Sequence, residues 1–315
     1  MLVAQNEANW FTNRPHLSFP FFALLAFPGP SAAQEVPADP LTQEGCQRCL
    51  WVSAGSMAGG ALAAMVVLDQ AWYADHERAP LHAFNDGREW LGMDKAGHAF
   101  SAYTLGAWGH ALVKSCGTRD RTALWTGGML GMVFLTGVEI LDGTSAEWGF
   151  SWWDMAANAA GTGLFIGQQA LWGEQRAVLK FSAHHTDYAA MRPSLLGEGP
   201  IERYLKDYNG QTIWLSVNPG SFLAEGRSPA WLNLAVGYGA SGMVTAAPPT
   251  HDMPVYMQLE RHRRFFLSPD LDLTRLPVRG KGWRTVLFVL NSIKVPLPAV
   301  EYQGRGRWRA HALYF

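Results

Sequence analysis

The first part of the chain alternates apolar stretches with short polar segments. The apolar stretches lie at residues 49–68, 96–113, 123–138 and 155–173. A helix that spans a bilayer needs about 20 apolar residues, and only the first stretch reaches that length without its flanks. The connections 114–122 and 142–151 are short, so we expect successive helices to run antiparallel. This pattern predicts a membrane-associated four-helix bundle; the alternative is a soluble bundle, rich in Ala and Gly, resting on a membrane surface.

The pattern changes near residue 185. The breakers Pro193, Gly197, Gly199 and Pro200 mark a boundary there. Residues 211–218 have the β-branched and aromatic content that is typical of a strand. Residues 283–293 have the apolar spacing of a helix. Residues 300–302 and 308–315 are predicted to be short strands that close the domain. We therefore predict a mainly α protein in which a membrane-associated four-helix bundle (49–184) is followed by a smaller α+β C-terminal domain (185–315).

The N-terminal 48 residues are typical of a targeting segment followed by a linker. Residues 19–27 form an apolar run that is too short to span a membrane. The small residues Ser31 and Ala33 follow it at the positions that a signal peptidase reads. We predict a signal peptide or, alternatively, an apolar Pro-rich arm at 1–33, and a linker at 34–48.

Aromatic and glycine residues in the helical part favour contact with a membrane. Tryptophans stand near the ends of the apolar stretches, as rings at a lipid–water interface do: Trp51, Trp72, Trp125, Trp152, Trp153 and Trp172. Glycines spaced four apart allow close helix packing: Gly55 and Gly59, Gly127 and Gly131, Gly163 and Gly167.

Composition narrows the class of protein further. Of the 315 residues 48% are hydrophobic and only 16% charged, which excludes a disordered chain, a coiled coil and a many-span transporter. A net charge of −1 gives no attraction for nucleic acid. We expect membrane lipid, and other envelope membrane proteins, as partners. Three cysteines exclude a disulfide framework, although Cys46 and Cys49 could pair in an oxidising compartment.

The polar residues of the predicted bundle gather at one of its ends. Antiparallel packing brings together the start of the second helix, the end of the third and the start of the fourth. The opposite end carries Lys114, Arg119 and Arg121. Candidate binding residues at the acidic end are Asp94, Lys95, His98, Glu139, Asp142, Asp154 and Asn158.

Three of these residues are candidates for chemistry. His98, Glu139 and Asp154 could hold a metal ion, and one imidazole among carboxylates suits Mn, Fe or Mg better than structural Zn. They could also act in catalysis, with Glu139 or Asp154 as base and His98 as ligand or acid. The pattern assigns neither a metal nor another cofactor.

A structural role explains the same residues, and we rank it first, ligand binding second and catalysis third. Ser151 and Asp154 match a capping box in which Asp154 reaches back to a free backbone N–H. Asp94 can stabilise the N-terminus of its helix. His98 and Glu139 can pair across helices, because ionisable groups in an apolar bundle need partners.

Three ordered blocks resemble a known family. They are the stretches 94–103 (DKAGHAFSAY), 137–143 (GVEILDG) and 149–161 (GFSWWDMAANAAG). Together they are similar to the YfiM-like family of predicted periplasmic proteins or lipoproteins, a domain of unknown function, and more distantly to VanZ-like membrane proteins. The region from Asn209 onward also resembles the longer YfiM-like members. Asp142 stands where VanZ-like proteins usually have Gln, and neither Cys46 nor Cys49 follows a run typical of lipidation.

The resemblance implies an envelope location and a helical core, and it implies no reaction. We expect a cell-envelope protein on the periplasmic side, associated with the outer rather than the inner membrane, that binds or scaffolds as a subunit of a membrane complex. The alternative is a membrane-associated hydrolase or metal-dependent enzyme acting on a lipid-linked or cell-wall substrate. The positive-inside rule conflicts with this location, because it would place loop 114–122 in the cytoplasm.

Overall fold

The computed structural model describes residues 43–73, 76–223, 228–304 and 306–315. The predicted signal peptide or arm (1–33) and most of the linker (34–48) lie outside these residues. The α-helices are α1 (Gln43–Leu68), α2 (Met93–Ser115), α3 (Asp120–Thr126), α4 (Leu130–Gly143), α5 (Trp152–Trp172), α6 (Tyr188–Met191), α7 (Pro193–Leu196), α8 (Pro200–Lys206) and α9 (Lys281–Leu290). The strands are β1 (Ala177–Ala183), β2 (Gln211–Val217), β3 (Leu232–Ser241), β4 (His262–Leu271), β5 (Leu297–Tyr302) and β6 (Trp308–Tyr314).

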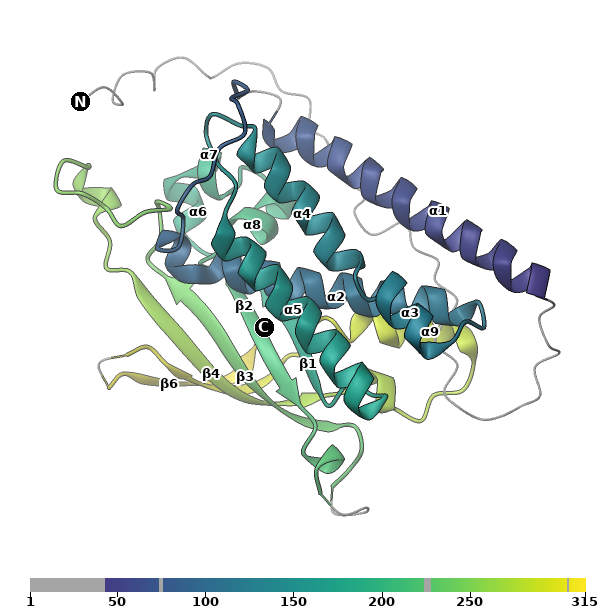
Figure 1. Cartoon of the computed structure of the whole chain (residues 1–315). Helices are drawn as coiled ribbons and strands as arrows, with labels where there is room; N and C mark the ends of the chain where they lie inside the picture. Colours follow the sequence, from purple (N-terminus) through teal and green to yellow (C-terminus); the bar gives the residue numbers. More distant parts are fainter. Residues whose placement is uncertain (1–42, 74–75, 224–227, 305) are drawn as a thin grey trace.

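Helix α2 lies at the centre of the helical layer and packs on α3, α4 and α5 (Figure 1). Glycines permit the close approach. A Cβ on Gly131 of α4 would lie 2.2 Å from the backbone oxygen of Ala102, and one on Gly161 of α5 would lie 2.0 Å from that of Ala99. The predicted pair Gly127 and Gly131 does sit at such contacts. The other two predicted pairs, on α1 and α5, have open space where a Cβ would stand.

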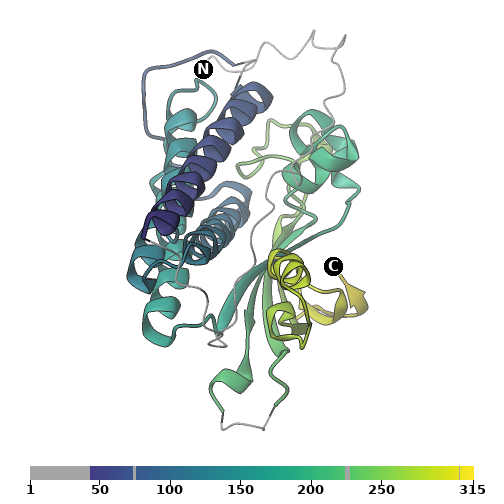
Figure 2. The same cartoon turned by 90° about the vertical axis from the view of Figure 1, so that its right-hand side faces the viewer.

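Helix α1 is long, apolar and largely uncovered (Figures 1 and 2). Within the described part of the chain, two segments are long and apolar enough to cross a membrane: Gly45–Leu68, in α1, and Asp120–Gly143, which covers α3 and α4. Only 6% of the apolar window in the first segment is buried, against 33% in the second. The first segment therefore has little protein covering it, whereas the second packs partly against its neighbours.

A disulfide bond joins Cys49 at the start of α1 to Cys116 just after α2, 67 residues along the chain. The expected pairing of Cys46 with Cys49 is therefore wrong, and Cys46 has a free thiol. The count of three cysteines left room for one bond, which ties α1 to the helical layer. Disulfides form and persist in oxidising compartments such as the periplasm.

The C-terminal part forms one antiparallel sheet of strands in the order β1-β2-β3-β4-β5-β6. The outer edge of β1 is occupied at its middle, because Phe181 N–H donates to the oxygen of Ser292 and the oxygen of Phe181 accepts from Lys294 N–H. Among the described residues no strand pairs with the outer edge of β6. The sheet thus has one covered edge and one open edge.

One face of the sheet packs on α2 over β1, β2 and β3. Met93 at the start of α2 packs with Ile213, Ala240 and Met243. The opposite face holds Trp214, Phe266 and Tyr314 together with buried charged groups. There Asp270 accepts from Lys180 Nζ at 2.8 Å and lies 3.5 Å from Lys294 Nζ, and all three side chains are at most 1% exposed.

The prediction of a mainly α protein built on a four-helix bundle is wrong. The described residues show a six-stranded antiparallel sheet against which the central helix α2 packs, so the fold is mixed. The third apolar stretch divides at Gly127–Met129 into α3 and α4, and α1 lies outside any bundle core. The proposed division at residue 184/185 stays a prediction; β1 lies on its N-terminal side.

Candidate functional site

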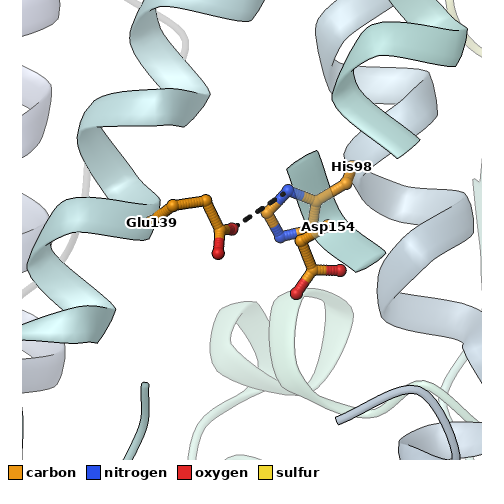
Figure 3. A group of neighbouring side chains, drawn as sticks. All are labelled: His98, Glu139 and Asp154. Carbon is orange, nitrogen blue, oxygen red and sulfur yellow. Dashed lines mark ion pairs between the residues drawn. The ribbon is translucent and has the colours of Figure 1, made fainter. Parts of the chain in front are cut away.

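Three helix ends meet at the acidic end of the helical layer. They contribute His98 from the second turn of α2, Glu139 from the last turns of α4 and Asp154 from the first turn of α5. Figure 3 shows the Glu139 carboxylate facing the His98 ring, with the Asp154 side chain next to that ring. His98 Nδ1 lies 3.7 Å from Glu139 Oε1, and each residue offers one ligand atom within 4.8 Å of the others. Glu139 and Asp154 are buried, whereas the His98 side chain is 20% exposed.

The N-terminus of α5 fixes two of these groups. Ser151 is its N-cap, and the Ser151 hydroxyl accepts the Asp154 backbone N–H at 3.1 Å. The other half of the predicted capping box is wrong: Glu139 Oε2, not Asp154, accepts the Ser151 N–H at 3.0 Å. Glu139 therefore ties α4 to the start of α5, and the Asp154 carboxyl is free to face α2.

Lys95 is surrounded by three aspartates. Its Nζ donates to Asp94 Oδ2 at 2.6 Å, lies 3.3 Å from Asp154 Oδ1 and makes a close contact with Asp86. Asp86 also accepts the Ser151 hydroxyl at 2.6 Å. Sequence reasoning missed Asp86, because it lies in an irregular segment with no periodicity to place it. Its only sequence signal is the turn-like Asn85-Asp86-Gly87.

The remaining predicted residues divide into one that joins the site and one that does not. Asn158, fully buried one turn beyond Asp154, accepts a hydrogen bond at Oδ1 from His98 Nδ1 at 3.0 Å. That bond leaves His98 Nε2 as the acceptor nitrogen. Asp142 instead accepts the Tyr73 hydroxyl at 2.5 Å and belongs to neither cluster of possible metal ligands among the described residues.

Burial sets the protonation of the cluster. It raises the pKa of Asp154 to about 8, helped by the hydrogen bond shared with Asp86 and the charges of Asp94 and Asp86, and opposed by Lys95. Burial alone would raise the pKa of Asp86, but its hydrogen bonds with Asp154, Lys95 and Ser151 lower that pKa below its usual value. Burial also lowers the pKa of His98, which favours the neutral imidazole. The opposite directions of the two pKa shifts favour Asp154 over Asp86 as the protonated carboxyl.

Several polar atoms in this cluster are buried without a hydrogen-bond partner in the described part of the chain. They are Asp94 Oδ1, Glu139 Oε1, Asp154 Oδ1 and Asn158 Nδ2. Lys95 Nζ lies 3.3 Å from Asp154 Oδ1, and His98 Nδ1 lies 3.7 Å from Glu139 Oε1. Buried carboxylate oxygens that lack partners are costly. A positive ligand would satisfy them.

The donor set suits one class of metal ion. Carboxylates with a single imidazole favour Mn²⁺, Mg²⁺ or Fe²⁺ over structural zinc, which prefers Cys and several His. His98, Glu139 and Asp154 form one possible ligand set, and Asp86, Asp94 and Asp154 form a second that shares Asp154. The Lys95 ammonium already lies among the carboxylates of the second set, so the first set is the better place for a cation.

Comparison with known proteins locates a family resemblance over this part of the chain. Residues 83–167 match the model of a family described as "Predicted periplasmic lipoprotein (DUF2279)". The matched segment contains every residue of the cluster. No curated protein and no solved structure is similar enough to match the chain. The family match supports a periplasmic location in the cell envelope.

Proposed function

We propose that this is a membrane-associated protein of the periplasmic envelope that binds a divalent cation through His98, Glu139 and Asp154. The convergence of their ligand atoms within 4.8 Å, from three different helices, carries the proposal. Bound there, the ion would tie α2, α4 and α5 together. The role is therefore one of binding and scaffolding, as a subunit of an envelope complex.

The charge balance of the cluster supports a missing cation. Four carboxyl groups lie around Lys95 and the neutral His98: Asp86, Asp94, Glu139 and Asp154. One proton held by Asp154 removes part of the excess negative charge. A divalent cation would displace that proton and bind the carboxylate oxygens that have no hydrogen-bond partner.

Other features of the structure support the proposed periplasmic location and membrane contact. The apolar helix α1 has very little protein covering it, and exposed tryptophans such as Trp51 and Trp125 border the apolar helices. The disulfide at Cys116 lies at the basic end of the helical layer, the end that the positive-inside rule would put in the reducing cytoplasm. This conflict favours the outer membrane over insertion into the inner one.

Titration of the purified, metal-free protein with Mn²⁺ tests the cation site. Calorimetry or the Mn²⁺ spin-resonance signal should give one ion per chain. Glu139→Gln, Asp154→Asn and His98→Ala should each weaken binding by roughly 10- to 100-fold. Asp142→Asn is the matched control, because Asp142 lies on the same helix as Glu139 but bonds Tyr73. Equal binding by all four variants would contradict the proposal.

A metal-dependent hydrolase acting on a lipid-linked or cell-wall substrate is the second candidate. One observation favours it: neighbouring carboxyls whose pKa values move in opposite directions, Asp154 upward and Asp86 downward, are a common source of acid and base groups. The test is turnover of a lipid-linked sugar diphosphate with Mn²⁺ present, compared between Glu139→Gln and Asp142→Asn. Turnover that Glu139→Gln abolishes and Asp142→Asn keeps would favour the enzyme over the scaffold.

A further inference from the structure

The face of the sheet that packs on α2 contains three consecutive cross-strand rows without a charged residue. The first row is aromatic apart from Ile213: Phe181, Ile213, Tyr238, Phe265, Tyr302 and Trp308. The second is aliphatic: Leu179, Leu215, Val236, Leu267, Val300 and Ala310. The third contains Ala177, Val217, Leu234 and Pro269.

Helix α2 and the segment before it cover these rows on β1, on β2 and at the Tyr238 end of β3, through residues such as Phe181 and Ile213. Farther along the sheet they are open: Val236 is 52% exposed and Trp308 is 70% exposed. Figure 1 shows β3, β4 and β6 extending past the helices.

Apart from Arg263, the charged side chains of the strands lie on the opposite face. Lys180, Asp270 and Glu301 are all buried there. In water an antiparallel sheet keeps its polar side chains outward and its apolar ones inward. Here the arrangement is reversed, as it is for strands that face lipid.

The order of side chains along the strands identifies what covers the open rows. Aliphatic residues are followed by the aromatic row, and one step beyond it stands Arg263, whose Nε donates to the Tyr238 hydroxyl at 3.2 Å. Aliphatic, then aromatic, then cationic is the order met on moving from the hydrocarbon of a bilayer to its headgroups. The six steps from Tyr238 to Leu232 cover about 20 Å at about 3.3 Å per residue, close to the apolar band of about 25 Å on lipid-facing strands.

We infer that the open part of this face, on β2 to β6, contacts the acyl chains of a lipid bilayer, with Tyr302 and Trp308 at the headgroup level. A soluble protein partner would not require the graded order, and a second copy would not require Arg263 to follow the aromatic row. The inference extends to the sheet the membrane association that we propose for α1, and it does not depend on the cation site.

Spin labels at single cysteines test the inference in the full chain with its disulfide intact. In a Cys46→Ser background, Val236→Cys and Leu267→Cys report on the open rows. Leu62→Cys reports on the exposed side of α1, and Asp252→Cys on an exposed polar loop. The protein is reconstituted in phosphatidylethanolamine–phosphatidylglycerol vesicles, and label collisions with oxygen and with a water-soluble nickel chelate are compared. We expect the oxygen-to-nickel ratio at positions 236, 267 and 62 to exceed that at 252 several-fold.

The other outcomes separate the inference from the proposal for α1. Ratios at 236 and 267 equal to that at 252, with a lipid signature kept at 62, would overturn the sheet inference alone. Spin–spin broadening between chains at 236 or 267, without the lipid signature, would assign the face to a second copy and overturn it too. A water signature at all four positions would remove both the sheet inference and the proposed membrane association.

Discussion

Two regions of the molecule bury charged side chains, and they differ in the sign of the charge that is in excess. In the sheet, the ammonium groups of Lys180 and Lys294 lie on either side of Asp270, and each also donates to backbone oxygens. At the acidic end of the helices, carboxyl groups outnumber the single charged amine of Lys95. The first region is sealed and the second is partly open at His98.

This difference separates a structural network from a binding site. Burial of charge is common to both regions, so burial by itself does not mark function. What distinguishes the helical cluster is its uncompensated negative charge in reach of solvent. The comparison predicts that removing the carboxylate of the sheet network strongly lowers the free energy of unfolding. Removing a carboxylate from the metal-free helical cluster should lower it far less.

The largest effect is expected from Asp270→Asn. The substitution leaves Lys180 and Lys294 buried without a counter-charge, a loss that typically costs about 3–5 kcal/mol. Denaturant unfolding followed by circular dichroism, together with the yield of folded protein, measures it. Asp154→Asn is the matched change in the helical cluster and should cost far less. A stability loss at position 270 no larger than that at 154 would break the comparison.

Cation binding should produce the next largest effect. A ligand that binds only the folded state at 100 times its dissociation constant adds about 2.7 kcal/mol to the free energy of unfolding. Mn²⁺ should therefore raise the melting temperature of the wild type and of Asp142→Asn. It should leave that of Glu139→Gln nearly unchanged. A similar rise in all three proteins would point to a cation site elsewhere.

The stability of the metal-free protein should fall as the pH rises toward about 8. The pKa of Asp154 is raised in the folded state, to about 8 from the usual 3.8. The folded protein therefore keeps a proton that the unfolded chain releases above pH 4. The contribution is full below pH 4 and declines by at most about 1.4 kcal/mol per pH unit up to pH 8. Melting temperatures from pH 7 to pH 9 measure it, above the pKa of about 6 to which burial raises the Asp142 carboxyl, so Asp154→Asn should flatten the curve whereas Asp142→Asn should not.

The smallest effect is expected from Asn158→Leu. Asn158 holds His98 through one hydrogen bond and has a buried Nδ2 without a hydrogen-bond partner, so the metal-free protein should change in stability by less than about 1 kcal/mol. Mn²⁺ affinity should fall about 10-fold, because the imidazole loses the partner that orients it. An unchanged affinity would show that His98 needs no such support.

The acidic cluster could be predicted from the sequence because helix geometry determines which of its residues lie on the same helix face. Asp94 and His98 are four residues apart, as are Asp154 and Asn158, so each pair shares a helix face. Short connections then set the helix directions. Asp86 escaped this reasoning, because its segment follows tertiary contacts such as the hydrogen bond from Phe84 N–H to the Phe150 oxygen.

The fold class could not be read from the same signals. An apolar helix that packs on a sheet has the same composition as one that packs in a bundle, and α2 does the former. Individual strands such as β2, β5 and β6 were predicted from residue content, and α9 from its apolar spacing. The assembly of these elements into one sheet could not be predicted, because pairing partners such as Phe181 and Ile293 lie far apart in sequence. The bond between Cys49 and Cys116 likewise joins helices whose proximity no local pattern encodes.

The two edges of the sheet limit how this chain can grow into larger assemblies. Backbone groups of Phe181 are already engaged by residues 292 and 294, whereas β6 keeps free backbone donors and acceptors among the described strands. A monomer with a single available edge can accept one neighbouring strand and no more. Association through this sheet would therefore stop at a pair and would not propagate into a fibre.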